Sequence, residues 1–154
     1  MDENPVTLAT DVETSLAGSL FNGVWSLLEN PSRTPEGDLR MIHMAHASRY
    51  HWGQVGTAVN VVRGEWQCSR VYATLGRGEP ALFHAKHALQ ICEANGIGDF
   101  DLAFCYEALA RAHAVAGDTD EARRWQQRGV DAAKDVLEDE DRELLVADLA
   151  SVPI

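Results

Sequence analysis

Two stretches of this chain, 41 residues apart, decide how its fold is interpreted. Residues 69–88 read SRVYATLGRGEPALFHAKHA, and residues 110–129 read ARAHAVAGDTDEARRWQQRG. At this offset Gly76 aligns with Gly117 and Ala81 aligns with Ala122. Glycine commonly ends a helix, and small residues on the following helix allow two helix axes to approach closely. The same offset aligns three further pairs: Arg70 with Arg111, Tyr72 with His113, and Ala88 with Gly129.

Residues that typically begin helices occur on both sides of these two stretches and extend the helical pattern to the whole chain. Thr34-Pro35, Thr57, Glu79-Pro80 and Asp99 are residues that open helices, and Asp118 with Glu121 forms a capping-box pattern. Short loops between helices favour antiparallel neighbours. The sequence therefore predicts an all-α fold of six or seven helices in antiparallel pairs. The expected helices cover about residues 8–29, 35–52, 58–75, 79–95, 100–116 after a cap at Asp99, a sixth from about 119, and a last short one over 140–150.

These residues carry a resemblance to the tetratricopeptide-repeat (TPR) family. Tyr72, Leu75-Gly76, Ala81, Ala85 and Ala88 match the aromatic, Leu-Gly and spaced-alanine pattern of that repeat. The second unit keeps Gly117 and Ala122 but has Gln126 where the first has Ala85, and the spacing is about seven residues longer than the family's 34. The stretch from Ser48 to Gly76 is also similar to a group of small bacterial TPR-like proteins that have no established activity.

The resemblance implies one domain over residues 1–154, built as a short stack of helix pairs. The expected parts are N-terminal helices over 1–56, degenerate repeats over about 62–98 and 103–134, and an acidic C-terminal cap over 138–154. Such a chain of 154 residues is long enough to bury a core of its own.

The charge balance excludes some classes of partner. The formal net charge is −11, so the field of the protein repels phosphate backbones and anionic membrane surfaces. We therefore expect neither nucleic acid nor a membrane as a partner. The run Glu138-Asp139-Glu140-Asp141 is interpreted as a solvated helix junction. Three cysteines without C-x-x-C spacing, together with a start that lacks a basic leader, predict buried thiols and a cytoplasmic location.

In TPR arrays the first helix of each pair lines a groove that binds peptides or partner proteins. The resemblance places six residues of this chain on that groove: Arg63, Trp66, Arg70, Phe104, Glu107 and Arg111. Spacings of three and four residues keep each set on one helical face. The fork-shaped donors of the aligned Arg70 and Arg111 suit a carboxylate or a phosphate on the partner. The alternative is that Arg63, Glu65, Glu107 and Arg111 form ion pairs within the chain, while Trp66 belongs to the core.

Histidines offer a second interpretation. His43 and His46 lie three residues apart on one expected helix, and His84 and His87 lie three apart on another. Imidazoles at this spacing share a helical face and could begin a zinc, copper or iron site. The chain has no H-E-x-x-H motif and no Glu-x-x-His pair of the kind found in di-iron bundles. Structural histidines are the competing explanation.

The polar and aromatic run from Tyr50 to Gln67 could instead form a small-molecule pocket, in which His51 or Glu65 serves as a general base. No G-x-S-x-G or P-loop accompanies it. The leading prediction is thus a non-enzymatic module without a cofactor that binds a protein or peptide, and the alternative is a small helical enzyme. The first helix carries an apolar stripe that is expected to cap the stack or join its core, with pairing to a second copy in a homodimer as the alternative. The residues of this stripe are Leu16, Leu20, Phe21, Val24, Trp25 and Leu28.

Overall fold

The computed structural model describes residues 5–154 and is all-α within them. Its seven helices are α1 (Thr10–Leu28), α2 (Pro35–Val55), α3 (Ala58–Thr74), α4 (Gly78–Asn95), α5 (Asp99–Val115), α6 (Thr119–Ala133) and α7 (Asp139–Ala150). The predicted all-α fold of antiparallel helix pairs is confirmed, with seven helices where six or seven were expected. The predicted bounds differ from the observed ones by three residues or fewer, because most of these helices begin and end at local sequence signals.

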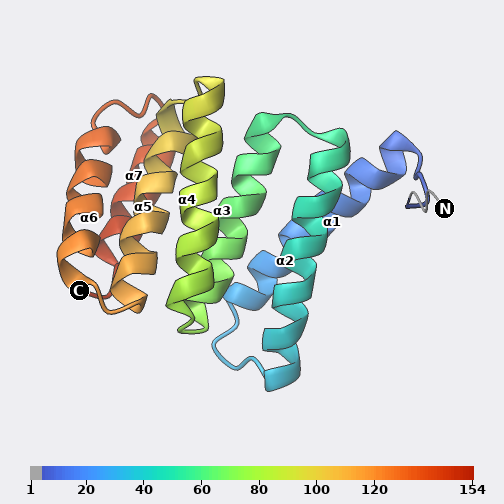
Figure 1. The fold of residues 1–154 in the computed structure, drawn as a ribbon, viewed down its shortest axis with the longest axis horizontal. Coiled ribbons are helices and arrows are strands. Elements are labelled where there is room, and N and C mark those ends of the chain that lie inside the picture. The colour runs from blue at the N-terminus through green and yellow to red at the C-terminus, as the bar shows by residue number, and fades with distance from the viewer. Residues whose placement is uncertain (1–4) are drawn as a thin grey trace.

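The helices pack as sequential antiparallel pairs along one axis. Helix α1 packs on α2, α3 on α4 and α5 on α6, and the chain advances from the α1–α2 end of the molecule to the α6–α7 end (Figure 1). The odd-numbered helices also contact one another in order, α1 with α3, α3 with α5, and α5 with α7. This row of odd-numbered helices positions the candidate site.

Helices α3 and α5 are equivalent in their local structure. Both bounds of α3, residues 58 and 74, lie 41 residues before the bounds of α5, residues 99 and 115. Each is followed by a glycine with positive φ, 73° at Gly76 and 88° at Gly117. The backbone N–H after each glycine donates to a carbonyl five residues back, Arg77 to Tyr72 and Asp118 to His113, both at 2.9 Å. This is the hydrogen-bond pattern that ends a helix at a left-handed glycine.

The capping predictions have mixed outcomes. The Thr34 hydroxyl accepts a hydrogen bond from the Gly37 N–H at 3.1 Å, and the Asp118 carboxylate accepts one from the Glu121 N–H at 3.2 Å. The prediction that Asp99 caps α5 was wrong. Asp99 is the first residue of the helix, with φ of 52°, and its carboxylate accepts a hydrogen bond from the Leu137 N–H at 3.1 Å. The Asp99 side chain therefore bonds the segment between α6 and α7 instead of capping the first turn of α5.

Small residues allow the pairs to pack closely. Ala81 and Ala85 lie on one face of α4, and Ala122 of α6 is the residue that aligns with Ala81. None of the three has exposed surface. The three cysteines, Cys68, Cys92 and Cys105, are free and buried, as predicted. Among residues 5–154 no helix is both long and apolar enough to cross a bilayer.

Candidate functional site

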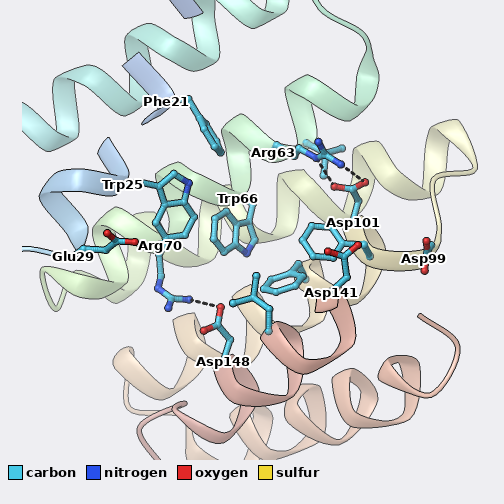
Figure 2. Close-up of a pocket in the computed structure, with 14 residues that line it drawn as sticks. Phe21, Trp25, Glu29, Arg63, Trp66, Arg70, Asp99, Asp101, Asp141 and Asp148 are labelled. Carbon is cyan, nitrogen blue, oxygen red and sulfur yellow. Dashed lines mark hydrogen bonds and ion pairs between the residues drawn. The ribbon is translucent and has the colours of Figure 1, made fainter. Parts of the chain in front are cut away.

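A cavity of about 700 Å³ lies along the row of odd-numbered helices. Its walls come from the C-terminal half of α1, the middle of α3, the first turns of α5 and the length of α7 (Figure 2). A volume of this size falls within the range of pockets that hold ligands. The lining residues are Phe21, Trp25, Glu29, Val62, Arg63, Trp66, Arg70, Asp99, Phe100, Asp101, Phe104, Asp141, Leu144 and Asp148.

The floor of the cavity is a continuous chain of aromatic rings. Trp25 of α1 contacts Trp66 of α3 with ring centroids 5.4 Å apart. Trp66 contacts Phe104 of α5 edge to face at 5.7 Å, and Phe104 contacts Phe100 at 4.6 Å. Offset and edge-to-face contacts of this kind hold aromatic rings rigidly. The floor therefore presents a preformed apolar surface across three helices.

Four of the six residues predicted for a groove line this cavity, namely Arg63, Trp66, Arg70 and Phe104. The other two lie outside its lining. Glu107 has no exposed surface, and Arg111 packs between α5 and α7. The helical register explains the difference, because Glu107 and Arg111 follow Phe104 toward the C-terminus of α5, beyond the end of the cavity.

The arginines join the odd-numbered helices to one another. Arg63 of α3 donates to Asp101 of α5 at 2.8 and 3.3 Å. Arg70 of α3 contacts Glu107 of α5 at 3.2 Å and Asp148 of α7 at 3.6 Å. Each guanidinium thus has an internal carboxylate partner. The ion-pair alternative had named Arg63 and Glu107 but not Arg70. The hydrogen bond to Asp101 also raises the pKa of Arg63 above its usual value.

Two buried polar atoms near this site have no hydrogen-bond partner within residues 5–154. One is the indole Nε1 of Trp66, and the other is Oε2 of Glu107. Trp66 is only 9% exposed and is part of the cavity floor. A buried donor without an acceptor costs about 1–3 kcal/mol, so a bound acceptor that reached this N–H would recover part of that cost.

The four histidines considered for a metal site do not gather in one place. The rings of His46 and His84 meet, with centroids 5.2 Å apart, whereas His43 is exposed and His87 stacks on the exposed Phe83. Each ring of the central pair has another partner. His46 Nε2 hydrogen-bonds the Tyr72 hydroxyl at 2.8 Å, and His84 Nδ1 bonds the Glu65 carboxylate at 2.6 Å. Across residues 5–154 no three His, Cys, Asp or Glu side chains have a metal-binding arrangement.

The pKa shifts in this histidine cluster follow from burial and from mutual charge. Burial, followed by the charge of His84, lowers the pKa of His46 below its usual value. Burial alone would raise the pKa of Glu65, but hydrogen bonds from His84 and from Arg49, the latter at 2.8 Å, outweigh it and lower that pKa. The cluster is an internally satisfied polar network between α2, α3 and α4.

The polar run from Tyr50 to Gln67 does not form one pocket. His51 bonds Glu13 of α1 at 2.9 Å, and Glu65 pairs with Arg49 and His84. The Asn60 side chain accepts a hydrogen bond from the Thr57 N–H at the start of α3. His51 and Glu65 therefore join different pairs of helices, and Asn60 bonds the start of its own helix. Residues three and four apart share one face of a helix, and the others point elsewhere.

Several lining residues were absent from the predicted site. Phe21 and Trp25 stood out only as part of an apolar stripe that could cap the stack or mediate a dimer. In the structure Val24 of that stripe is buried, whereas Phe21 and Trp25 face the cavity. Phe100 could have been found from its spacing of four residues before Phe104. The acidic residues of α7 carried no such signal, because their place depends on how α7 packs against α5.

Comparisons of the chain with protein-family models, with curated proteins and with solved structures found no match, so no family is identified for it.

Proposed function

We propose that this protein is a binding module that holds a segment of a partner protein or a peptide in the aromatic cavity. The observation that carries the proposal is the floor of Trp25, Trp66, Phe100 and Phe104, preformed across three helices and open to an occupant of about 700 Å³. Rigid aromatic side chains supply much of the binding energy at protein interfaces.

Three further features support a peptide rather than a compact ligand. The cavity extends over four helices, which suits an elongated occupant. The buried Trp66 N–H has no partner among residues 5–154, so a peptide carbonyl that reached the cavity floor could accept its hydrogen bond. The matched bounds of α3 and α5 and their equivalent glycine ends also agree with the resemblance to TPR arrays, in which the first helix of each pair contacts the peptide.

The test is a selection of binding peptides from a random library displayed on phage. Two exposed residues of α7 then provide a variant inside the cavity and a matched control outside it. Leu144 is 52% exposed and lines the cavity, whereas Val146 is 51% exposed and does not. We expect enriched peptides to bind the wild type and the Val146→Gln variant equally, and to bind Leu144→Gln several-fold more weakly. A second pair, Trp25→Ala against Trp125→Ala on α6, repeats the comparison with aromatic residues.

Binding is measured by isothermal titration calorimetry with synthetic copies of the enriched peptides. Circular dichroism melting confirms that each variant is folded. A library that yields no peptide above background, or peptides that bind Leu144→Gln and Trp25→Ala as tightly as the wild type, would overturn the proposal.

A further inference from the structure

The charges around the cavity are unbalanced in a way that restricts its occupant. Its lining contains five carboxylates and two guanidinium groups, an excess of three negative charges. Both guanidinium groups are already paired with carboxylates of the protein. Within residues 5–154, Glu29, Asp99 and Asp141 line the same cavity and form no ion pair.

These acidic side chains flank the aromatic floor. Figure 2 shows Glu29 beside Trp25 at one end of the cavity and Asp99 and Asp141 at the other, with Trp66 between them. Glu29 is exposed at the C-terminal end of α1, and Asp141 lies in the first turn of α7. An occupant that crosses the floor thus meets carboxylates at both ends and aromatic rings in the middle.

On the basis of the proposed function, we infer that the occupant is an extended peptide segment with apolar residues between two basic residues. Lysine or arginine side chains at its ends face Glu29 and the Asp99–Asp141 end, while the apolar residues cover Trp25 and Trp66. The aliphatic stem of a basic side chain packs on an aromatic ring while its charge reaches a carboxylate. The overall charge of −11 attracts such a segment over a distance.

An anionic segment fits the same cavity poorly. To bind Arg70 it would have to compete with Glu107, which has no exposed surface and would keep only Arg111 as a partner. Arg63 already donates to Asp101 through two of its five N–H groups, so an anion on the remaining donors would lie close to that carboxylate. The earlier expectation of a carboxylate on the partner therefore gives way to a cationic partner.

The inference is tested with three synthetic peptides that share one apolar core: Lys-Leu-Leu-Lys, Gln-Leu-Leu-Gln and Glu-Leu-Leu-Glu, each acetylated and amidated. Binding is followed by calorimetry and by the intrinsic fluorescence of the four tryptophans, two of which, Trp25 and Trp66, line the cavity. We expect the lysine peptide to bind about threefold to tenfold more tightly than the glutamine peptide, and the glutamate peptide to bind weakest. The advantage of the lysine peptide should shrink between about 0.05 M and about 0.5 M salt, because salt screens exposed charges.

Two charge-reversal variants separate a local effect from the overall charge. Glu29→Lys with Asp141→Lys changes the two ends of the cavity, and Glu93→Lys with Asp135→Lys makes the same change in net charge at exposed positions outside its lining. We expect the first variant to reverse the order of the three peptides and the second to preserve it. Glu29→Gln with Asp141→Asn, which adds no positive charge, should remove most of the preference and serves as a milder change should the first variant fail to fold.

The outcomes distinguish this inference from the proposed function. Equal binding of the three peptides to the wild type, or an equal effect of the two charge-reversal variants, would overturn the inference. Cavity-dependent peptides without basic residues from the library selection would also overturn it and would leave the proposed function intact. Failure of the selection itself counts against the proposed function.

Discussion

Arg70 and Arg111 donate to the same carboxylate oxygen from two different helices. Arg70 of α3 contacts Oε1 of Glu107 at 3.2 Å, and Arg111 of α5 contacts that atom at 2.7 Å. Arg111 also donates to the Asp148 carbonyl at 2.9 Å and to the Ser151 hydroxyl at 2.7 Å. The two arginines that the 41-residue offset aligns therefore meet at one buried carboxylate and join α3, α5 and α7.

This arrangement predicts a large effect of Glu107→Gln on stability. The substitution removes the negative charge that two arginines share in a buried place, and we expect the free energy of unfolding to fall by about 3 kcal/mol. Urea denaturation followed by circular dichroism measures the change. The matched control is Asp101→Asn, which removes the partner of the half-exposed Arg63 and should cost less than about 1 kcal/mol. Equal effects of the two substitutions would contradict the structural role of Glu107.

The close contact between α4 and α5 predicts that Gly78→Ala destabilises the protein. A Cβ at Gly78 would lie 2.6 Å from Ala116 Cα and 2.8 Å from its backbone nitrogen, so one helix end must shift. We expect a cost of about 2 kcal/mol, typical of overpacking, and a lower melting temperature.

Gly23→Ala is the control for this prediction. Its new Cβ would meet only the terminal methyl group of Met44, at 2.5 Å, and a flexible side chain can move aside. We expect its cost to be under about 1 kcal/mol, because alanine also favours the helix more than glycine does. A Gly78→Ala variant as stable as Gly23→Ala would show that the helix ends are not in close contact.

The histidine cluster predicts a dependence of stability on pH. The folded protein holds the pKa of His46 below its usual value of 6.5, chiefly by burial and by the charge of His84, so the unfolded chain takes up that proton at a higher pH. Stability from this group is fully present above about pH 6.5 and is lost as the pH falls below it. Burial lowers the pKa of His113 in the same direction. The lowered pKa of Glu65 acts in a separate window, below about pH 4.5.

We therefore expect the free energy of unfolding, measured in urea, to decrease from pH 7 to pH 5. His46→Gln should reduce this decrease without abolishing it, because His113 remains. The comparison variant is His43→Gln, which changes an exposed histidine one turn away; because the charge of His43 is only the smallest of the causes that lower the pKa of His46, this variant should change the slope less than His46→Gln does. A slope that is the same in the wild type and in His46→Gln would contradict the contribution of His46.

The buried thiols predict resistance to modification. Burial raises the pKa of Cys68 to about 12, and the contact with Cys92 together with burial raises the pKa of Cys105. Cys92 lies 3.7 Å from Cys105, sulfur to sulfur, and its thiol is also without exposed surface. Only the thiolate reacts readily, and only when a reagent reaches it.

We expect Ellman's reagent at pH 8 to label no cysteine of the native protein within minutes and all three after denaturation. A Ser32→Cys variant, which places a thiol in the exposed α1–α2 loop, provides the positive control. Rapid labelling of one native thiol or more would show that the α4–α5 contact or the α2–α3 contact opens readily.

Much of the fold could be predicted because the signals that end and begin helices are local. Gly76 and Gly117 adopt left-handed conformations that other residues rarely tolerate, and Thr34 and Asp118 cap helices within three residues of themselves. Such contacts depend only on near neighbours in the chain. Asp99 shows where this reasoning fails, because the partner of its side chain is Leu137, 38 residues away.

The sequence by itself thus determined the helices and their order, and helical spacing placed Arg63, Trp66 and Arg70 together on one face of α3. Only the tertiary structure decided the composition of the cavity, since Phe21 and Glu29 of α1 and Asp141 and Asp148 of α7 enter it by packing against α3 and α5. The pairing of the arginines was decided in the same way. Charged groups can be recognised as free or paired only when the whole chain is folded, because their partners lie on other helices and Coulomb interactions depend on distance in space.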